Sequence, residues 1–91
     1  MTSVIRKVMV RNTRGLHARA AAKFVETLRG FDAEARVATA TEAVDADSIM
    51  ELLMLGAGPG TELTLETRGK DAEAAADALE ALVAAGFHET D

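Results

Sequence analysis

The sequence predicts an α+β fold in which helices cover one face of a sheet, as a two-layer sandwich. Segments of alternating or β-branched residues interleave with segments whose apolar residues recur every three or four positions. Glycine or polar breaks separate these segments. The 91 residues are 48% hydrophobic, which suits one small core. The resulting order, β-α-β-β-α-β-α, buries the apolar helix faces most simply when all the helices share one side.

The first strand and the first helix flank a short break. "SVIRKVMV", residues 3–10, is rich in β-branched residues and predicts a strand. Polar residues and a glycine at positions 12–15 form a turn-like break. A helix is predicted from residue 17 or 18 to residue 28, with Gly30 as its stop. The residues that recur at helical spacing in this segment are Ala21, Phe24, Val25 and Leu28.

The middle of the chain predicts three strands and a short helix. "AEARVATATEAVDA", residues 33–46, fits two short strands with a turn near residues 39–41. A short helix is predicted over residues 48–55, and "GAGPG", residues 56–60, cannot continue it. "TELTLET", residues 61–67, alternates leucine with polar residues, which is typical of a strand with one wet face.

The last helix has the clearest pattern. Asp71 is the predicted N-cap, and Gly86 is the predicted end. An apolar stripe lies opposite acidic residues, as in a helix that packs on a sheet. The stripe comprises Ala72, Ala75, Ala76, Leu79, Leu82 and Val83.

Composition excludes several classes of protein. There is no cysteine, so a disulfide framework, a thiolate metal site and a cysteine nucleophile are excluded. The net charge of −5 and the lack of Tyr and Trp argue against nucleic-acid binding. No apolar run is long enough for membrane insertion, so we expect a cytoplasmic protein. Charge is nevertheless uneven, because residues 1–30 hold seven of the ten basic residues and only one acid.

His17 lies at the predicted start of the first helix, within this basic region. A helix start leaves N–H groups without intrahelical partners, and it accommodates phosphate. We therefore expect the backbone N–H groups of Ala18, Arg19 and Ala20 to bind a phosphate. The same field, with Arg14 and Arg19 nearby, favours the neutral imidazole, which is the form that can attack a phosphoryl group.

Other interpretations of His17 remain open on this reasoning. A lone histidine near a helix start can be a solvated cap with no chemical role. A metal site has little support, because His88 lies in the tail and no acidic pair recurs at ligand spacing beside His17. A serine-type triad lacks ordered partners in the sequence. A small α+β interaction module in which His17 merely caps a helix therefore remains an alternative.

Two blocks of sequence resemble one family. "GLHARAAAKF" together with "DSIMELLMLGAGPGTELTL" resembles the HPr family, the histidine-containing phosphocarriers of the bacterial phosphoenolpyruvate-dependent phosphotransferase system. The resemblance covers essentially the whole chain, as one domain over residues 1–91. It implies an open-faced β-sandwich, with a four-stranded antiparallel sheet and three helices on one face.

The resemblance also implies roles for single residues. His17 would accept and donate the phosphoryl group as a transient phosphohistidine, and Arg19 would contact that group and the partner. Enzyme I would be the donor and an enzyme IIA domain the acceptor. Such a carrier has no small-molecule substrate and no cofactor of its own, and we expect a monomer.

The sequence departs from the family pattern at two positions. Ala20 stands where the family usually has proline, and "HARAAAKF" is closer to the nitrogen-related branch, which favours a regulatory relay over sugar uptake. Asp47 stands where many members have lysine, just before Ser48, the position that an HPr kinase/phosphorylase modifies in many members. Ser48 and Glu51 also form a capping-box pattern, so Ser48 can be a helix cap, a regulatory site or both.

The segment "IMELLML" is almost entirely apolar and follows Ser48 directly. A short helix cannot turn every one of these side chains into a small core. We expect Leu52 and Leu55 in the core, and Ile49, Met50 and Leu53 in a partner-binding surface like that of the family. Ordinary core packing of all five is the alternative.

Overall fold

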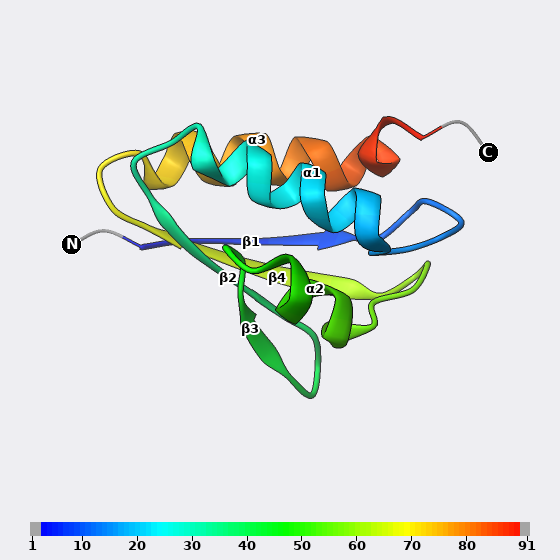
Figure 1. Ribbon diagram of the computed structural model, residues 1–91. Coiled ribbons are helices and arrows are strands. Elements are labelled where there is room, and N and C mark those ends of the chain that lie inside the picture. The colour runs from blue at the N-terminus through cyan, green and yellow to red at the C-terminus, as the bar shows by residue number, and fades with distance from the viewer. Residues whose placement is uncertain (1–2, 90–91) are drawn as a thin grey trace.

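The computed structural model describes residues 3–89, which form one four-stranded sheet and three α-helices (Figure 1). The predicted order of elements is confirmed. None of the helices within residues 3–89 combines the length and apolarity that crossing a bilayer requires. The elements are β1 (Ser3–Met9), α1 (Ala18–Arg29), β2 (Glu34–Ala38), β3 (Ala43–Asp45), α2 (Ile49–Leu55), β4 (Glu62–Arg68), α3 (Ala72–Ala84) and a short 3₁₀ turn, Gly86–His88.

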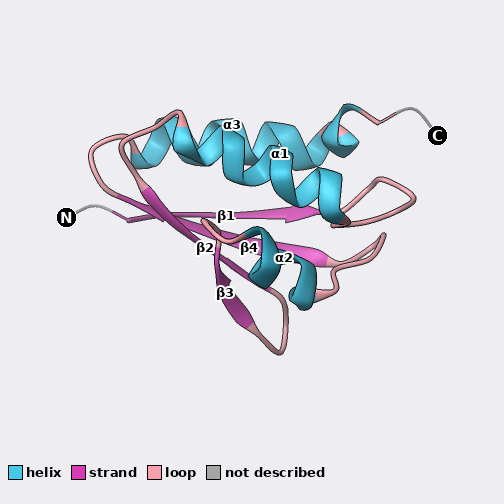
Figure 2. Cartoon of the chain, in the orientation of Figure 1, coloured by secondary structure: helices cyan, strands magenta, loops and turns pink. Residues whose placement is uncertain are grey.

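The sheet is antiparallel throughout, with strand order β1-β4-β2-β3. In the central strand β4, the buried residues alternate with more exposed ones, as its sequence predicts. The helices α1 and α3 lie together on one side of the sheet (Figure 2). The other face is open, and the side chains of Ile5 and Met9 in the edge strand β1 are among the exposed large hydrophobic groups. The open-faced sandwich is therefore confirmed.

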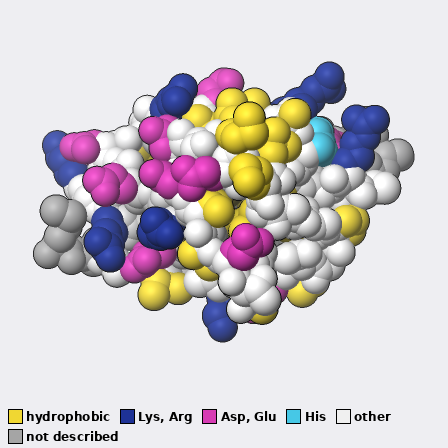
Figure 3. Space-filling model, turned by 60° about the horizontal axis from the view of Figure 1, so that its bottom comes forward, with side chains coloured by type: hydrophobic (Ala, Val, Ile, Leu, Met, Phe, Trp, Pro, Cys, Tyr) yellow, Lys and Arg dark blue, Asp and Glu magenta, His cyan; other side chains and the backbone are white. Residues whose placement is uncertain are grey.

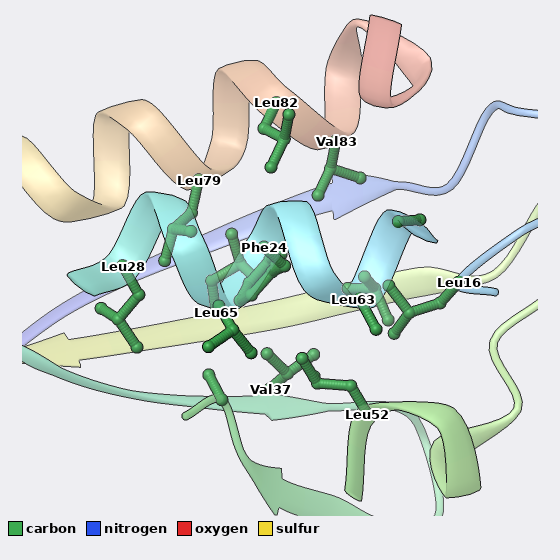
Figure 4. Close-up of a cluster of buried hydrophobic side chains, with 14 of the residues drawn as sticks. Leu16, Phe24, Leu28, Val37, Leu52, Leu63, Leu65, Leu79, Leu82 and Val83 are labelled. Atoms are coloured by element: carbon green, nitrogen blue, oxygen red, sulfur yellow. The ribbon is translucent and has the colours of Figure 1, made fainter. Parts of the chain in front are cut away.

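The core lies between the sheet and the helices. Phe24 of α1, Leu65 of β4 and Val37 of β2 are fully or almost fully buried there. Figure 4 shows these side chains directed into one cluster, which Leu52 of α2 joins. Both Leu52 and Leu55 are buried, so their predicted core positions are confirmed. Without aromatic residues other than phenylalanine, aliphatic side chains supply most of the packing.

The predicted N-cap position of Asp71 is confirmed, but the side-chain capping expected of it is wrong. Asp71 stands at the N-cap position of α3, but its side chain makes no capping hydrogen bond there. Its carboxylate instead accepts a hydrogen bond from the Asp32 N–H at 2.8 Å, and the Asp71 N–H donates to the Asp32 carbonyl at 2.9 Å. These two bonds join the loops that follow α1 and β4. The carboxylate therefore satisfies a distant loop amide and not those of its own helix.

Candidate active site

A tight contact between two loops places His17. Gly15 has a φ of +65°, and a Cβ there would lie 2.5 Å from the carbonyl oxygen of Ala57. The Leu16 N–H donates a hydrogen bond to that same oxygen at 2.9 Å. Only glycine fits this left-handed backbone at such a close approach. The loop before α1 is therefore fixed against the loop after α2.

His17 is the N-cap residue of α1. Its backbone is extended, with φ −80° and ψ −179°, and its carbonyl accepts the first helical hydrogen bond, from the Ala21 N–H at 2.8 Å. Its Nδ1 accepts a hydrogen bond from the Arg19 N–H at 3.2 Å. The ring thus caps the helix with a lone pair, and 22% of the side chain remains exposed.

The other ring nitrogen of His17 contacts a carboxylate from the far end of the chain. His17 Nε2 is hydrogen bonded to Glu89 Oε2, and the buried Asn12 donates from Nδ2 to Glu89 Oε1 at 3.0 Å. The hydrogen bond from Asn12 lowers the pKa of Glu89 from its ordinary value, and His17 adds to this, against burial, which raises it. Because an ionised carboxylate only accepts hydrogen bonds, we assign the ring proton to Nε2. The lone pair is then on Nδ1.

Basic side chains surround the ring on the solvent side. A surface hollow of about 580 Å³ is lined by His17 and by the predicted neighbours Arg14 and Arg19, both of which are exposed. Lys23 also lines it, and its Nζ donates to the Phe87 carbonyl at 2.7 Å. A larger hollow, of about 710 Å³, contains neither histidine. The hollow beside His17 thus joins a nucleophilic ring to positive charge.

The three backbone N–H groups expected to bind a phosphate lie at the start of α1. The Arg19 N–H is engaged by the His17 ring. No backbone acceptor is found for the N–H groups of Ala18 and Ala20 within residues 3–89. Ala20 itself is buried in the first turn, where alanine forms the helix without the usual proline. Amides of this kind are available to an incoming anion.

Ser48 caps α2, as predicted. Its Oγ accepts a hydrogen bond from the Glu51 N–H at 3.1 Å. The reciprocal half of the predicted capping box is not formed, because the Glu51 carboxylate accepts from the Asp45 N–H at 3.2 Å. Asp47 pairs with Arg29 at 3.1 Å, and both side chains are largely exposed. The cap therefore lies among acidic groups.

The apolar surface of α2 differs in part from the expectation. Ile49 is 41% exposed and Met50 is 65% exposed, whereas Leu53 is half-buried against the core. Met54, which the sequence analysis did not single out, is 74% exposed. Figure 3 shows an apolar cluster on one face of the molecule, with a histidine at its edge and basic side chains beyond it. We call Ile49, Met50 and Met54 the α2 patch.

Sequence reasoning missed three residues around the ring. The sequence pattern places Asn12 in a turn and indicates no role for Lys23 or Glu89. Lys23 stands four residues after Arg19 in an amphipathic helix, and that spacing could have placed the two basic side chains on the same face. No local pattern indicates Glu89, which is 72 residues away from His17 in the sequence. Within residues 3–89, no group of three or more histidine or acidic side chains is arranged to hold a metal ion.

Comparisons with known proteins agree with this geometry. Residues 4–85 match the family described as PTS HPr component phosphorylation site. The chain is 45% identical to the phosphocarrier protein NPr of Shewanella violacea over 98% of both chains. It is 44% identical to the phosphocarrier protein HPr of Cupriavidus necator, over 92% of this chain and 94% of that protein. The fold also aligns with a crystal structure of HPr from Thermoanaerobacter tengcongensis over the full length of both chains, at 36% identity and a TM-score of 0.88.

The fold, the helix-capping histidine and these matches lead to one conclusion. The match spans nearly all of the chain, and the relatives correspond to it along nearly their whole length. The chain therefore belongs to the HPr family of phosphocarrier proteins of the phosphotransferase system.

Proposed function

We propose that His17 accepts a phosphoryl group from phospho-enzyme I and passes it to an enzyme IIA component. One observation carries this proposal. The ring of His17 presents Nδ1 at the start of α1, while Nε2 is held by the Glu89 carboxylate. A neutral imidazole held in this way has a nucleophilic nitrogen with a defined direction. The surrounding basic side chains supply the positive charge that a phosphoryl group needs.

The transfer needs no proton movement at the carrier. Nδ1 attacks phosphorus, the new N–P bond forms, and the bond from phosphorus to the donor atom on enzyme I breaks. Nε2 keeps its proton, and Glu89 balances the positive charge that develops on the ring. The reverse attack by a nucleophile on enzyme IIA breaks the N–P bond and returns neutral His17. Atoms and charges therefore balance in both directions.

The Arg19 backbone has two successive tasks in this scheme. Its N–H first directs the Nδ1 lone pair, through a hydrogen bond whose 3.2 Å length makes it easy to break. Once Nδ1 bonds to phosphorus, this N–H is free to donate to a phosphoryl oxygen. The N–H groups of Ala18 and Ala20 and the Arg19 guanidinium, which is exposed, complete the oxyanion contacts.

The α2 patch is the proposed docking surface for both partners. Ile49, Met50 and Met54 expose apolar side chains, and flexible methionines suit a surface that binds several proteins. Leu53 contributes less, because it is half-buried. Affinities should be weak and exchange fast, since a carrier must leave each partner.

Phosphorylation of purified variants tests the proposal. The wild-type chain is incubated with enzyme I, magnesium and labelled phosphoenolpyruvate, next to His17→Ala and, as a matched control, His88→Asn. Asparagine suits the left-handed backbone of His88, whose φ is +60°. We expect acid-labile label on the wild type and on His88→Asn, and none on His17→Ala. Equal label on His17→Ala contradicts the proposal.

The nitrogen-related branch is the second part of the proposal. It is supported by Ala20 in the first turn of α1 and by the full-length similarity to the NPr of Shewanella violacea. Transfer from the phosphorylated chain to purified enzyme IIA of the nitrogen type and of a sugar type separates the branches. Faster transfer to the nitrogen-type protein supports the proposal, and faster transfer to the sugar-type protein contradicts it.

The alternative is a chiefly regulatory protein that acts through its phosphorylation state at His17 or Ser48, and Ser48 distinguishes it from the carrier. Phosphorylation there would have to displace the cap to Glu51 and place a dianion close to Asp47. Incubation with an HPr kinase/phosphorylase and ATP tests this alternative. Acid-stable phosphate on the wild type that is absent from Ser48→Ala supports it, and a wild type without acid-stable phosphate rejects it.

A further inference from the structure

Three consecutive residues after α3 have a left-handed backbone. Gly86, Phe87 and His88 have φ values of +64°, +57° and +60°. Glycine adopts this conformation readily, but phenylalanine and histidine do so rarely. Two such residues in a row persist only where the surrounding structure holds them. The turn therefore has a structural purpose.

Several contacts hold this turn in place. Phe87 is fully buried in the core. Its carbonyl accepts a hydrogen bond from Lys23 Nζ at 2.7 Å, so the turn is tied to α1. The Glu89 N–H donates to the Gly86 carbonyl at 3.1 Å, which closes the turn. The buried ring thus anchors the turn, and α1 fixes its orientation.

The turn delivers Glu89 to the start of α1. Figure 1 shows the segment after α3 at the same end of the molecule as the first turn of α1. There the Glu89 side chain, which is 14% exposed, contacts His17 Nε2. Its second oxygen accepts from Asn12, which also donates to the Gly15 carbonyl at 2.7 Å. Asn12 therefore links the carboxylate to the loop that positions the ring.

We propose that Glu89, oriented by Asn12, is a positioning residue that fixes His17 in the Nε2–H tautomer for phosphoryl transfer. The transfer part of this inference rests on the proposed function. Glu89 reaches the ring nitrogen that faces away from the transferred group, so it acts through His17. The three residues form a chain in which an amide orients a carboxylate and the carboxylate orients an imidazole, as third groups do in hydrolase triads.

The arrangement has a second chemical effect. As Nδ1 attacks phosphorus, the ring becomes cationic, and an adjacent carboxylate stabilises that cation. Arg14, Arg19 and Lys23 oppose a cationic ring, because all three line the same hollow. Glu89 is the acidic side chain lining that hollow within residues 3–89. Removing the negative charge of Glu89 should therefore slow the transfer step and leave docking on the α2 patch unchanged.

Ring nitrogen chemical shifts of ¹⁵N-labelled protein measure the tautomer directly, without any transfer. The shifts are recorded at a pH at which the ring is neutral, for the wild type, Glu89→Gln and Glu89→Asp. Glu42→Gln is the control, because Glu42 is exposed in the turn between β2 and β3. We expect the Nε2–H tautomer alone in the wild type and in the control. Glu89→Gln should show a mixture, because its amide can donate to Nε2, and Glu89→Asp should restore the wild-type pattern in part.

Transfer kinetics from phospho-enzyme I complete the test. With Glu89→Gln as the acceptor, we expect the kcat of enzyme I to fall about tenfold, which is the effect of losing one charge-assisted hydrogen bond. The KM of enzyme I for the variant should stay within about twofold of its KM for the wild type. A single cooperative thermal unfolding transition, as in the wild type, shows that the variant is folded. A wild-type tautomer and a wild-type kcat in Glu89→Gln overturn the inference. If His17 accepts no label even in the wild type, the proposed function fails, while the nitrogen shifts still decide whether Glu89 positions the ring.

Discussion

The starts of α1 and α2 have the same local geometry and opposite surroundings. Each helix begins at a residue with an extended backbone whose side chain accepts a hydrogen bond from an amide of the first turn. The acceptor is His17 Nδ1 in α1 and Ser48 Oγ in α2. Around His17 the neighbouring charges are mostly basic, whereas Asp47 and Glu51 stand beside Ser48.

We infer from the comparison that the surrounding charges, and not capping alone, favour phosphorylation at His17, the site proposed above. A phosphoryl dianion at His17 would lie among more basic than acidic side chains, whereas at Ser48 it would lie beside Asp47, which pairs with Arg29, and near Glu51. The ring of His17 keeps a second nitrogen for Glu89, so one residue can cap, be oriented and react. Ser48 has a single oxygen, which the cap already uses.

The largest effect is expected from Gly15→Ala, which disrupts the contact between the loop before α1 and the loop after α2. The new Cβ would lie 2.5 Å from the Ala57 carbonyl on a backbone with a φ of +65°. We expect the free energy of unfolding to fall by about 2–4 kcal/mol in urea denaturation. Gly58→Ala is the control, because a Cβ at Gly58 meets no atom within 4 Å. Similar stabilities of the two variants would show that the loop contact is dispensable.

Arg19→Ala should have the next largest effect, because it removes a basic group from the His17 side. The guanidinium would stabilise the transferred phosphoryl group, and such a contact corresponds to about tenfold in rate. The rate of labelling by phospho-enzyme I measures it. Arg29→Ala, an exposed arginine at the other end of the same helix, is the control and should label like the wild type. Equal losses in both variants would indicate a general charge effect.

Ser48→Ala should affect stability but not transfer. Loss of the hydrogen bond to the Glu51 N–H removes the cap of α2, which costs about 1 kcal/mol of unfolding free energy. Ser48→Thr keeps the hydroxyl and should lose less. Labelling of His17 should stay at the wild-type rate in both variants. A slower rate in Ser48→Ala alone would mean that the two helix starts are coupled.

The smallest effect concerns pH. The pKa of Glu89 is lower in the folded chain than its ordinary value, chiefly because of Asn12 and secondarily because of His17. The ionised carboxylate therefore stabilises the fold above that ordinary value, and this contribution is lost as the pH falls through the folded-state pKa. We expect the wild type to exceed Glu89→Gln by roughly 0.5 kcal/mol at pH 7, with the gap closing in acid. Urea unfolding from pH 7 to pH 3 measures it, and a gap that widens in acid would contradict this sign.

Local patterns predicted most of the fold. The spacing of Ala21, Phe24, Val25 and Leu28 marks the buried face of α1, and all four are buried as expected. Alternation in β4 likewise assigned Leu63 and Leu65 to the core. These predictions succeed because the period of the apolar residues follows from helix and strand geometry.

Two of the misses share a physical cause, which is that contacts across the fold override local preference. Asp71 fits an N-cap by its residue type, yet a loop amide at Asp32 takes its carboxylate. Glu89 contacts His17 only because of a left-handed turn, which no pattern in the sequence predicts at Phe87 and His88. Met54 is different, since it lies four residues after Met50, and helical spacing could have placed both on one exposed face.

The contact of Gly15 with Ala57 has a consequence for partner choice. It joins the loop that carries His17 to the loop that follows α2. The position of the His17 ring relative to the α2 patch therefore depends on this contact. A partner that docks as proposed needs an apolar surface that fits the α2 patch. It also needs its own reactive group at the same distance and direction from that surface as His17 has from the patch. If the α2 patch is the docking surface, as we propose, we expect an insertion in either loop to weaken transfer to every partner that docks there.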